Sequence, residues 1–264
     1  MSGRSFQRTR KRLLSLLLCF AMASSLLVTT AAAKGPEDAV APVYNAAEDV
    51  YEISTPAQLM YLSGTWKEGP PRDGNYVLTA DIDMAGWEGF RPIASEKEEG
   101  YLGTFDGRYH VIRNLTIDYP KKYVGLFGYV GNENDQAYVK NVAMLDCEIR
   151  GQQNVGGIAG VTYGTITGCV VTGHVWVDDL SNSPTSGGIA GKVKEGEGPI
   201  IGHVENCYVN ANVEAPYDVG GIAGIQDGGG FVGNSLAAGT VNAYGENGSA
   251  GGIAGSFNAR DRII

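Results

Sequence analysis

The chain has 264 residues, enough for one or two domains, and 39 of them are glycine. Its 20 basic and 29 acidic residues give a formal net charge of −9 at pH 7. An acidic chain repels nucleic acids and anionic lipid surfaces at long range, which argues against both as partners.

The first 33 residues have the three-part pattern of a secretory signal peptide. They contain five basic residues, namely Arg4, Arg8, Arg10, Lys11 and Arg12. An apolar run over 13–28 follows, and then the small residues Ala31 to Ala33. A run of about 16 residues is short for spanning a bilayer. The sequence therefore predicts export with cleavage after Ala33 and membrane contact only before cleavage. The mature chain would carry 15 basic and 29 acidic residues, a net charge of −14.

Residues 34–49 are rich in alanine, proline and acidic residues, and they are predicted to form a flexible lead-in. A short helix is expected after the strand-like segment 51–53. Thr55 is its N-cap, Pro56 its first residue, and Gln58 completes a capping box. Leu59 and Leu62 give this helix an apolar face, which we expect to cover the first layer of the fold.

Asp81 and Asp83 lie in a predicted strand, where alternation puts both carboxylates on one face about 7 Å apart. Asp106 follows in the turn FDG over 105–107. Such a group is a candidate for calcium binding or for acid–base cleavage of sugars. The alternative, which we favour, is that these carboxylates cap the first turn of the fold or face water.

Two motifs recur from here to the end of the chain. Glycine-rich GLFG or GIAG segments begin at 125, 157, 188, 221 and 252. A second motif, of the form apolar-x-Asn-apolar, is centred on Asn114, Asn141, Gly168, Asn206 and Asn234. Recurrence at periods near 30 residues indicates stacked units that share one core. The abundance of Gly, Val, Ile and Thr favours strands. The sequence thus predicts an all-β fold, a right-handed parallel β-helix (solenoid) with a short N-terminal capping helix.

The register of this solenoid can also be predicted. Asn and Gly tolerate the left-handed region, so the five central residues are expected to form one column at a bend. Glycine in the GIAG segments is expected to permit a bend and the close approach of the backbone. Three inward ladders are expected: Leu126, Ile158, Ile189, Ile222 and Ile253; Ile112, Val139, Ile166, Val204 and Val232; and Ile149, Val175, Val213 and Val241.

These segments resemble a known family. GLFG at 125–128 resembles the GLUG motif of bacterial surface proteins, and GIAG followed by NCYV is similar to the same repeat. The segments ISTPAQLMYLS, YVLTADIDM and GTFDGRYHVIRNL are similar to the leader that precedes such repeats. The resemblance covers about 50–257 and departs from the pattern at Gly168 and Ser235. It implies an exported cell-surface β-solenoid, either in adhesin-like proteins or flanking immunoglobulin-A-cleaving zinc peptidases.

On this basis the predicted organisation is a signal peptide (1–33), a flexible lead-in (34–49), an N-terminal cap with the first rungs (50–120), and GLUG-type repeats (121–264). Only SFNARDRII follows the last glycine segment, so truncation at the C-terminus is expected.

The inventory of reactive residues argues against an enzyme. His110, His174 and His203 are far apart and form no HExxH motif, and no G-x-S-x-G elbow is present. We predict no catalytic residue, cofactor or metal. Cys169 and Cys207 occupy the same repeat position, and buried free thiols are favoured over a disulfide.

Five aromatic residues are candidates for a sugar-binding face, although packing on the solenoid surface is the favoured interpretation. They are Tyr119, Tyr123, Trp176, Tyr208 and Tyr217.

The functional hypothesis is a non-catalytic, secreted segment of a bacterial cell-surface protein, with a structural or adhesive role. Its expected partners are a host or cell-wall glycan or protein, and self-association through open strand edges. The alternatives are a polysaccharide-degrading β-helix and an accessory region of a surface zinc peptidase.

Overall fold

The computed structural model describes residues 32–63, 71–96, 100–177 and 184–258. The chain from Lys34 onward forms one compact unit. The predicted signal peptide, 1–33, lies outside the described residues except for its last two. No helix in the described ranges has the length and apolar character needed to cross a membrane.

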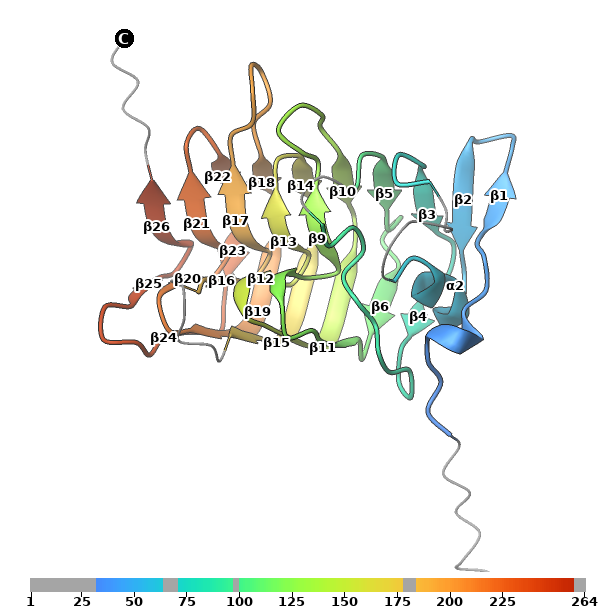
Figure 1. The fold of residues 1–264 in the computed structure, drawn as a ribbon, viewed down its shortest axis with the longest axis horizontal. Helices are drawn as coiled ribbons and strands as arrows, with labels where there is room; N and C mark the ends of the chain where they lie inside the picture. Colours follow the sequence, from blue (N-terminus) through green and yellow to red (C-terminus); the bar gives the residue numbers. More distant parts are fainter. Residues whose placement is uncertain (1–31, 64–70, 97–99, 178–183, 259–264) are drawn as a thin grey trace, which may run out of the picture. The chain divides into compact units, whose positions relative to one another are not determined.

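The strands of this unit stack into four sheets, here named sheets I to IV (Figure 1). Sheet I contains β1 (Val43–Asn45), β2 (Val50–Ile53), β3 (Tyr76–Leu78), β5 (Thr104–Asp106), β10 (Tyr138–Lys140), β14 (Thr165–Thr167), β18 (His203–Glu205) and β22 (Phe231–Gly233). Sheet II contains β4 (Ile82–Asp83), β6 (Val111–Arg113), β7 (Thr116–Asp118), β11 (Ala143–Gly151), β15 (Val170–Val177), β19 (Tyr208–Ala215), β23 (Leu236–Ala237) and β24 (Thr240–Ala243). Sheet III contains β8 (Lys122–Val124), β12 (Gln153–Gly156), β16 (Ser186–Gly187), β20 (Asp218–Gly220) and β25 (Ser249–Gly251). Sheet IV contains β9 (Phe127–Val130), β13 (Ala159–Thr162), β17 (Ala190–Lys194), β21 (Ala223–Asp227) and β26 (Ala254–Asn258).

The chain visits the four sheets in a fixed order. Strands β10, β11, β12 and β13 lie in sheets I, II, III and IV, and β14 then returns to sheet I beside β10. One such circuit is called a rung below. Neighbouring rungs pair in parallel, for example β10 with β14 and β11 with β15. The predicted all-β parallel solenoid is therefore confirmed.

The segment 34–49, predicted to be a flexible lead-in, contains regular structure. A 3-10 turn, η1 (Pro36–Asp38), precedes β1, and β1 pairs antiparallel with β2. The acidic and alanine-rich composition gave no sign of this strand, because only three residues form it and none of them is buried.

The predicted helix is present as α2 (Pro56–Tyr61), with Thr55 as its N-cap. The Thr55 hydroxyl accepts from the Gln58 backbone N–H at 3.3 Å, whereas the Gln58 side chain accepts from the backbone N–H of Ser54 at 2.8 Å. The return bond of the capping box is thus shifted by one residue. Leu59 and Leu62 are buried in the same core as the strands, as a covering helix requires.

Two of the predicted inward ladders are confirmed. Ile149, Val175, Val213 and Val241 are directly paired between successive strands of sheet II. Leu126, Ile158, Ile189 and Ile222 are completely buried, while Ile253 in the last rung is 42% exposed. The third ladder was wrong at its first member. Ile112 pairs with Met144 and Ile82 in sheet II, and Phe105 is the residue that pairs with Val139 in sheet I.

The predicted column at the bend is correct for four residues and wrong for one. Asn141, Gly168, Asn206 and Asn234 follow aligned strands of sheet I with φ of 56°, 64°, 55° and 46°. Asn114 also has a positive φ of 54°, but its strand pairs with 143–145, so it aligns with Asp146 at the following corner. In that rung the turn 107–110 makes the bend instead, with Arg108 and Tyr109 at positive φ.

The glycines of the GIAG segments serve close approach rather than the bend. The first glycine contacts the next rung, and a Cβ on Gly188 would lie 2.3 Å from the carbonyl oxygen of Gly221. The last glycine contacts sheet III of the preceding rung, and a Cβ on Gly191 would lie 2.4 Å from the carbonyl carbon of Asn154. Neither glycine has a positive φ. Any side chain there would push apart backbones that are in contact, so the motif recurs with the rungs.

Candidate functional site

The acidic residues singled out in the sequence are engaged at the corners of the first rungs. Asp81 accepts from the backbone N–H of Val111 at 3.0 Å and lies 3.1 Å from His110 Nδ1. Asp83 accepts from Asn114 Nδ2 at 2.8 Å and from the backbone N–H of Ala85 at 3.0 Å. These bonds lower the pKa of both carboxyls, chiefly through Val111 for Asp81 and Asn114 for Asp83. Both carboxylates therefore hold successive corners together.

Asp106 has the same role one rung further on. Burial acts to raise the pKa of its carboxyl, but bonds from the Arg108 backbone and the Asn141 side chain, with the charge of Lys140, outweigh it and lower the pKa. Within the described ranges, no three His, Cys, Asp or Glu side chains are grouped so as to hold a metal ion.

The three cysteines that follow the predicted signal peptide, Cys147, Cys169 and Cys207, are buried free thiols. Cys169 and Cys207 occupy equivalent positions on adjacent rungs, two residues after the paired Thr167 and Glu205. The hydrogen bond with the Cys207 thiol, together with burial, raises the pKa of Cys169 well above its ordinary value. Burial raises the pKa of Cys147 to about 12. All three thiols are enclosed in the hydrophobic core, where they act as small apolar side chains.

The five aromatic residues predicted to form one sugar-binding face lie in separate parts of the structure. Trp176 stacks on His174 with ring centroids 4.2 Å apart, on the outer side of sheet II. Tyr208 is partly exposed on the same sheet, and Tyr217 follows it before sheet III. Tyr119 and Tyr123 instead line a pocket beside β8, so only these two of the five candidates come together.

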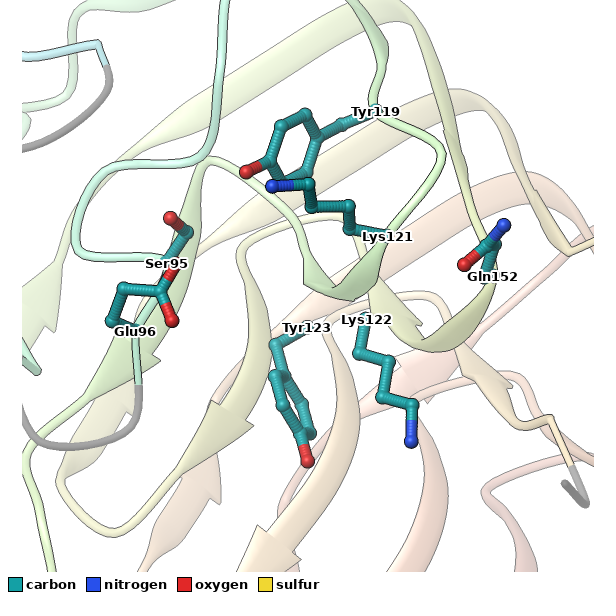
Figure 2. Close-up of a pocket in the computed structure, with 7 residues that line it drawn as sticks. All are labelled: Ser95, Glu96, Tyr119, Lys121, Lys122, Tyr123 and Gln152. Atoms are coloured by element: carbon teal, nitrogen blue, oxygen red, sulfur yellow. The ribbon is translucent and has the colours of Figure 1, made fainter.

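The pocket at β8 has a volume of about 320 Å³ and is lined by Ser95, Glu96, Tyr119, Lys121, Lys122, Tyr123 and Gln152 (Figure 2). The Lys121 ammonium lies 5.5 Å from the centroid of the Tyr119 ring. In Figure 2, Ser95 and Glu96 lie across the pocket from Lys121 and Tyr119. The side chains of Tyr123 and Lys122 extend away from Lys121 and Tyr119. A left-handed backbone at Tyr123, with φ of 64°, helps to set the direction of this side chain.

A second pocket, of about 210 Å³, shares Tyr123 with the first. It is lined by Tyr123, Tyr129, Asn154, Val161, Tyr163, Lys192 and Lys194. The rings of Tyr123 and Tyr129 are 4.8 Å apart, and the Lys194 ammonium lies 5.2 Å from the centroid of the Tyr163 ring. Burial, followed by a hydrogen bond with Tyr123, raises the pKa of the Tyr129 hydroxyl.

The two pockets share Tyr123, and we call their joint surface the tyrosine–lysine groove. The residues on the sheet IV side come from equivalent positions of successive rungs, because Tyr129, Val161 and Lys192 are directly paired. Tyr123 and Asn154 are equivalent in sheet III, since each lies between paired neighbours. Side chains one above another on a parallel sheet form a continuous surface.

Reasoning from the sequence did not identify Tyr129, Tyr163, Lys192 or Lys194. The signal that would have found them is the alignment of the segments after each glycine motif. GYVG at 128–131, GVTY at 160–163 and GKVK at 191–194 then superimpose, and their second and fourth residues fall into two outward columns.

Comparison with known proteins gives a partial likeness. No family model matches the chain. Halomucin from Haloquadratum walsbyi is 35% identical over an alignment of 121 residues, and the alignment covers 43% of this chain and 1% of halomucin. A crystal structure from Bacteroides ovatus, named a "putative immunoglobulin A1 protease", has a TM-score of 0.64 and 29% identity over 79% of this chain and 62% of that chain. The chain thus spans a very small part of halomucin and less than two thirds of the solved chain. It is a parallel β-solenoid similar to parts of these two proteins.

Proposed function

We propose that this chain is a non-catalytic, secreted segment of a cell-surface protein, related to the GLUG-repeat solenoids, and that it acts in adhesion. The observation that carries this proposal is the tyrosine–lysine groove, where the half-buried rings of Tyr119 and Tyr123 lie with lysines from several rungs. Rings and cations bind ligands but supply neither a carboxylate pair nor an activated nucleophile. The likeness to part of halomucin supports a place at the cell surface.

The carboxylates argue in the same direction. A sugar-cleaving β-helix needs a pair of carboxyl groups free to face one glycosidic bond. Asp81, Asp83 and Asp106 each accept hydrogen bonds from the following rung, which ties them to the fold. A polysaccharide-degrading enzyme is therefore not favoured.

Export and adhesion are tested on the full-length chain with a C-terminal epitope. We expect the protein outside the cells with Lys34 as its first residue, and retention of beads coated with it on a mucin-coated surface. Retention inside the cell would contradict the location. Beads that wash off as readily as beads coated with albumin would contradict adhesion.

A second candidate is an accessory region of an immunoglobulin-A1-cleaving peptidase, and the likeness to the Bacteroides ovatus structure favours it. In that case the chain should bind immunoglobulin A1 without cleaving it. Surface plasmon resonance and electrophoresis of the immunoglobulin after incubation measure the two properties. Binding of mucin but not of immunoglobulin A1 would leave the adhesive proposal as the better one.

A further inference from the structure

The tyrosine–lysine groove concentrates cations on an acidic protein. The chain has nine lysines, and four of them, Lys121, Lys122, Lys192 and Lys194, line this surface. Lys192 pairs with Asp227 at 3.3 Å. Among the described residues, the other three have no carboxylate within ion-pair distance. This cluster of unpaired cations makes the groove locally positive, although the chain has a net charge of −9.

The acidic residues near the groove do not cancel this charge. Glu96 lines the first pocket, but Figure 2 shows it across the pocket from Gln152. Glu133 accepts from the Tyr163 hydroxyl at 3.3 Å, and Asp227 is paired with Lys192. Four ammonium groups therefore lie near three carboxylates, and two of these, Glu133 and Asp227, are already engaged. A ligand that brings its own negative charge fits the remaining cations.

The cations are spread along the stack rather than focused on one point. Lys122 precedes Tyr123 in the rung of β8 and β9, and Lys192 lies in β17, two rungs further on. Two rungs correspond to about 10 Å along the stack. A single phosphate or sulfate cannot reach both ends, whereas an extended chain with repeated charges can.

The rings between the cations favour a saccharide over other extended anions. Tyr119 and Tyr123 are half-buried and line the pocket, so they offer apolar area to a ligand. The C–H face of a pyranose packs on such rings, while its hydroxyls need hydrogen-bonding groups. Gln152 and Asn154 line the same surface, and the Asn154 side-chain oxygen already accepts from Thr185 at 3.0 Å, which leaves its amide N–H groups as donors.

We propose that the tyrosine–lysine groove binds a carboxylated oligosaccharide, with uronic or sialic acid groups on the lysines and sugar rings on the half-buried Tyr119 and Tyr123. This inference rests on the proposed adhesive function and names its ligand class. Long-range repulsion from the acidic surface does not prevent it, because charges farther apart than about 8 Å are largely screened at physiological salt.

The test is calorimetric titration of residues 34–264, the compact unit that holds the described core, at physiological salt. The probes are tetragalacturonate, its fully methyl-esterified form and α2,8-linked tetrasialic acid, so that both acidic saccharides carry repeated charges. Tetraglutamate serves as a peptide of like charge. We expect at least one of the two acidic saccharides to bind, with the ester and the peptide at least tenfold weaker. The two acidic saccharides distinguish a polyuronate from a sialylated glycan as the source.

Two lysines of the groove, the exposed Lys122 and the half-buried Lys194, supply the variants. Lys122→Gln and Lys194→Gln should each weaken binding of the acidic saccharide about five- to tenfold. The control Lys34→Gln removes the same charge outside the groove and should leave binding unchanged. Thermal unfolding of all three variants should match that of the parent chain, because none of these side chains belongs to the core.

The outcomes separate the two proposals. Equal binding of acid and ester, or unchanged affinity in both groove variants, overturns the charge preference while adhesion stands. Tighter binding of tetraglutamate than of either saccharide overturns the saccharide assignment. Failure of both acidic saccharides to bind overturns the inference, and the bead assay then decides separately whether adhesion itself holds.

Discussion

Asn141 donates through Nδ2 to Asp106 Oδ1 at 3.1 Å, although the two residues are 35 positions apart in the chain. The same oxygen accepts from the backbone N–H of Arg108 at 2.8 Å. The contact links the corner of one rung to the corner of the next. It combines a left-handed backbone at Asn141 with a carboxylate that stabilises the turn below.

Two replacements of Asn141 distinguish the energetic contribution of its left-handed backbone from that of its side-chain hydrogen bond. Asn141→Gly keeps the left-handed conformation and loses the hydrogen bond, so we expect a loss of about 1 kcal/mol in the free energy of unfolding. Asn141→Ala adds the steric penalty of the left-handed region, about 1–2 kcal/mol more. Urea denaturation measures both. Equal losses in the two variants would show that backbone strain at this corner is unimportant.

Acid should destabilise the protein through its corner carboxylates. The pKa values of Asp81, Asp83 and Asp106 are lowered in the folded chain. A lowered pKa contributes stability that is present above the unfolded value of about 3.9 and is lost as pH falls through the folded pKa.

Asp106→Asn removes the contribution of one of these groups. We therefore expect a lower melting temperature than the parent at pH 6 and a smaller difference at pH 2.5. A difference between the two proteins that stays constant over this range would contradict the assignment.

The first glycine of the GIAG segments offers a matched pair of substitutions. A Cβ on Gly221 would lie 2.2 Å from the Gly252 carbonyl oxygen, whereas a Cβ on Gly252 meets no atom within 4 Å among the described residues. Gly221→Ala should lower the free energy of unfolding by about 3 kcal/mol, since backbone atoms must move. Gly252→Ala should change stability by less than about 0.5 kcal/mol. Comparable losses at both sites would mean that rung spacing is not what selects glycine.

The covering role of α2 is tested at its buried face. Leu59 has no exposed surface, while Tyr61 is partly exposed. Leu59→Ala should lower the free energy of unfolding by about 2–5 kcal/mol because it leaves a cavity in the core. Tyr61→Ala serves as the control and should cost less. If both variants unfold at the same denaturant concentration, the helix does not seal the first rung.

The last described rung has the features of a self-association surface. β26 pairs with β21 on one side, and Ile253 and Phe257 are 42% and 66% exposed. Unpaired edges beside apolar side chains favour association between chains. We expect the apparent mass of 34–264 in light scattering to rise with concentration. Ile253→Lys combined with Phe257→Lys should suppress this rise, and a monomer at every concentration would contradict the prediction.

The fold was predictable because two periodic signals report the same circuit. The residues Asn141, Gly168, Asn206 and Asn234 mark one corner, and the register of sheet I follows from them. Asn114 was predicted at the wrong corner because an apolar-x-Asn-apolar segment fits any corner of the solenoid. Its true position depends on the turn 107–110, which makes the bend without an asparagine.

The groove was less predictable than the fold. Tyr119 and Tyr123 stood out as aromatic residues, but Lys192 and Lys194 come from a rung about 70 positions further along the chain. Residues at equivalent outward positions differ in type from rung to rung: Tyr129, Val161 and Lys192 are paired in one column. Only the register of sheet IV brings them together, and register is a property of the folded chain.

The circuit through four sheets also has a mechanical consequence. Each rung of about 30 residues contributes about 4.8 Å to the stack, but the same residues reach about 100 Å when extended. A force that peels off one rung therefore releases roughly twenty times its folded length, while the remaining rungs keep their own hydrogen bonds. The length released by a distant rung would lower the force on a ligand bound at the groove. The stack can therefore extend under load before that ligand dissociates.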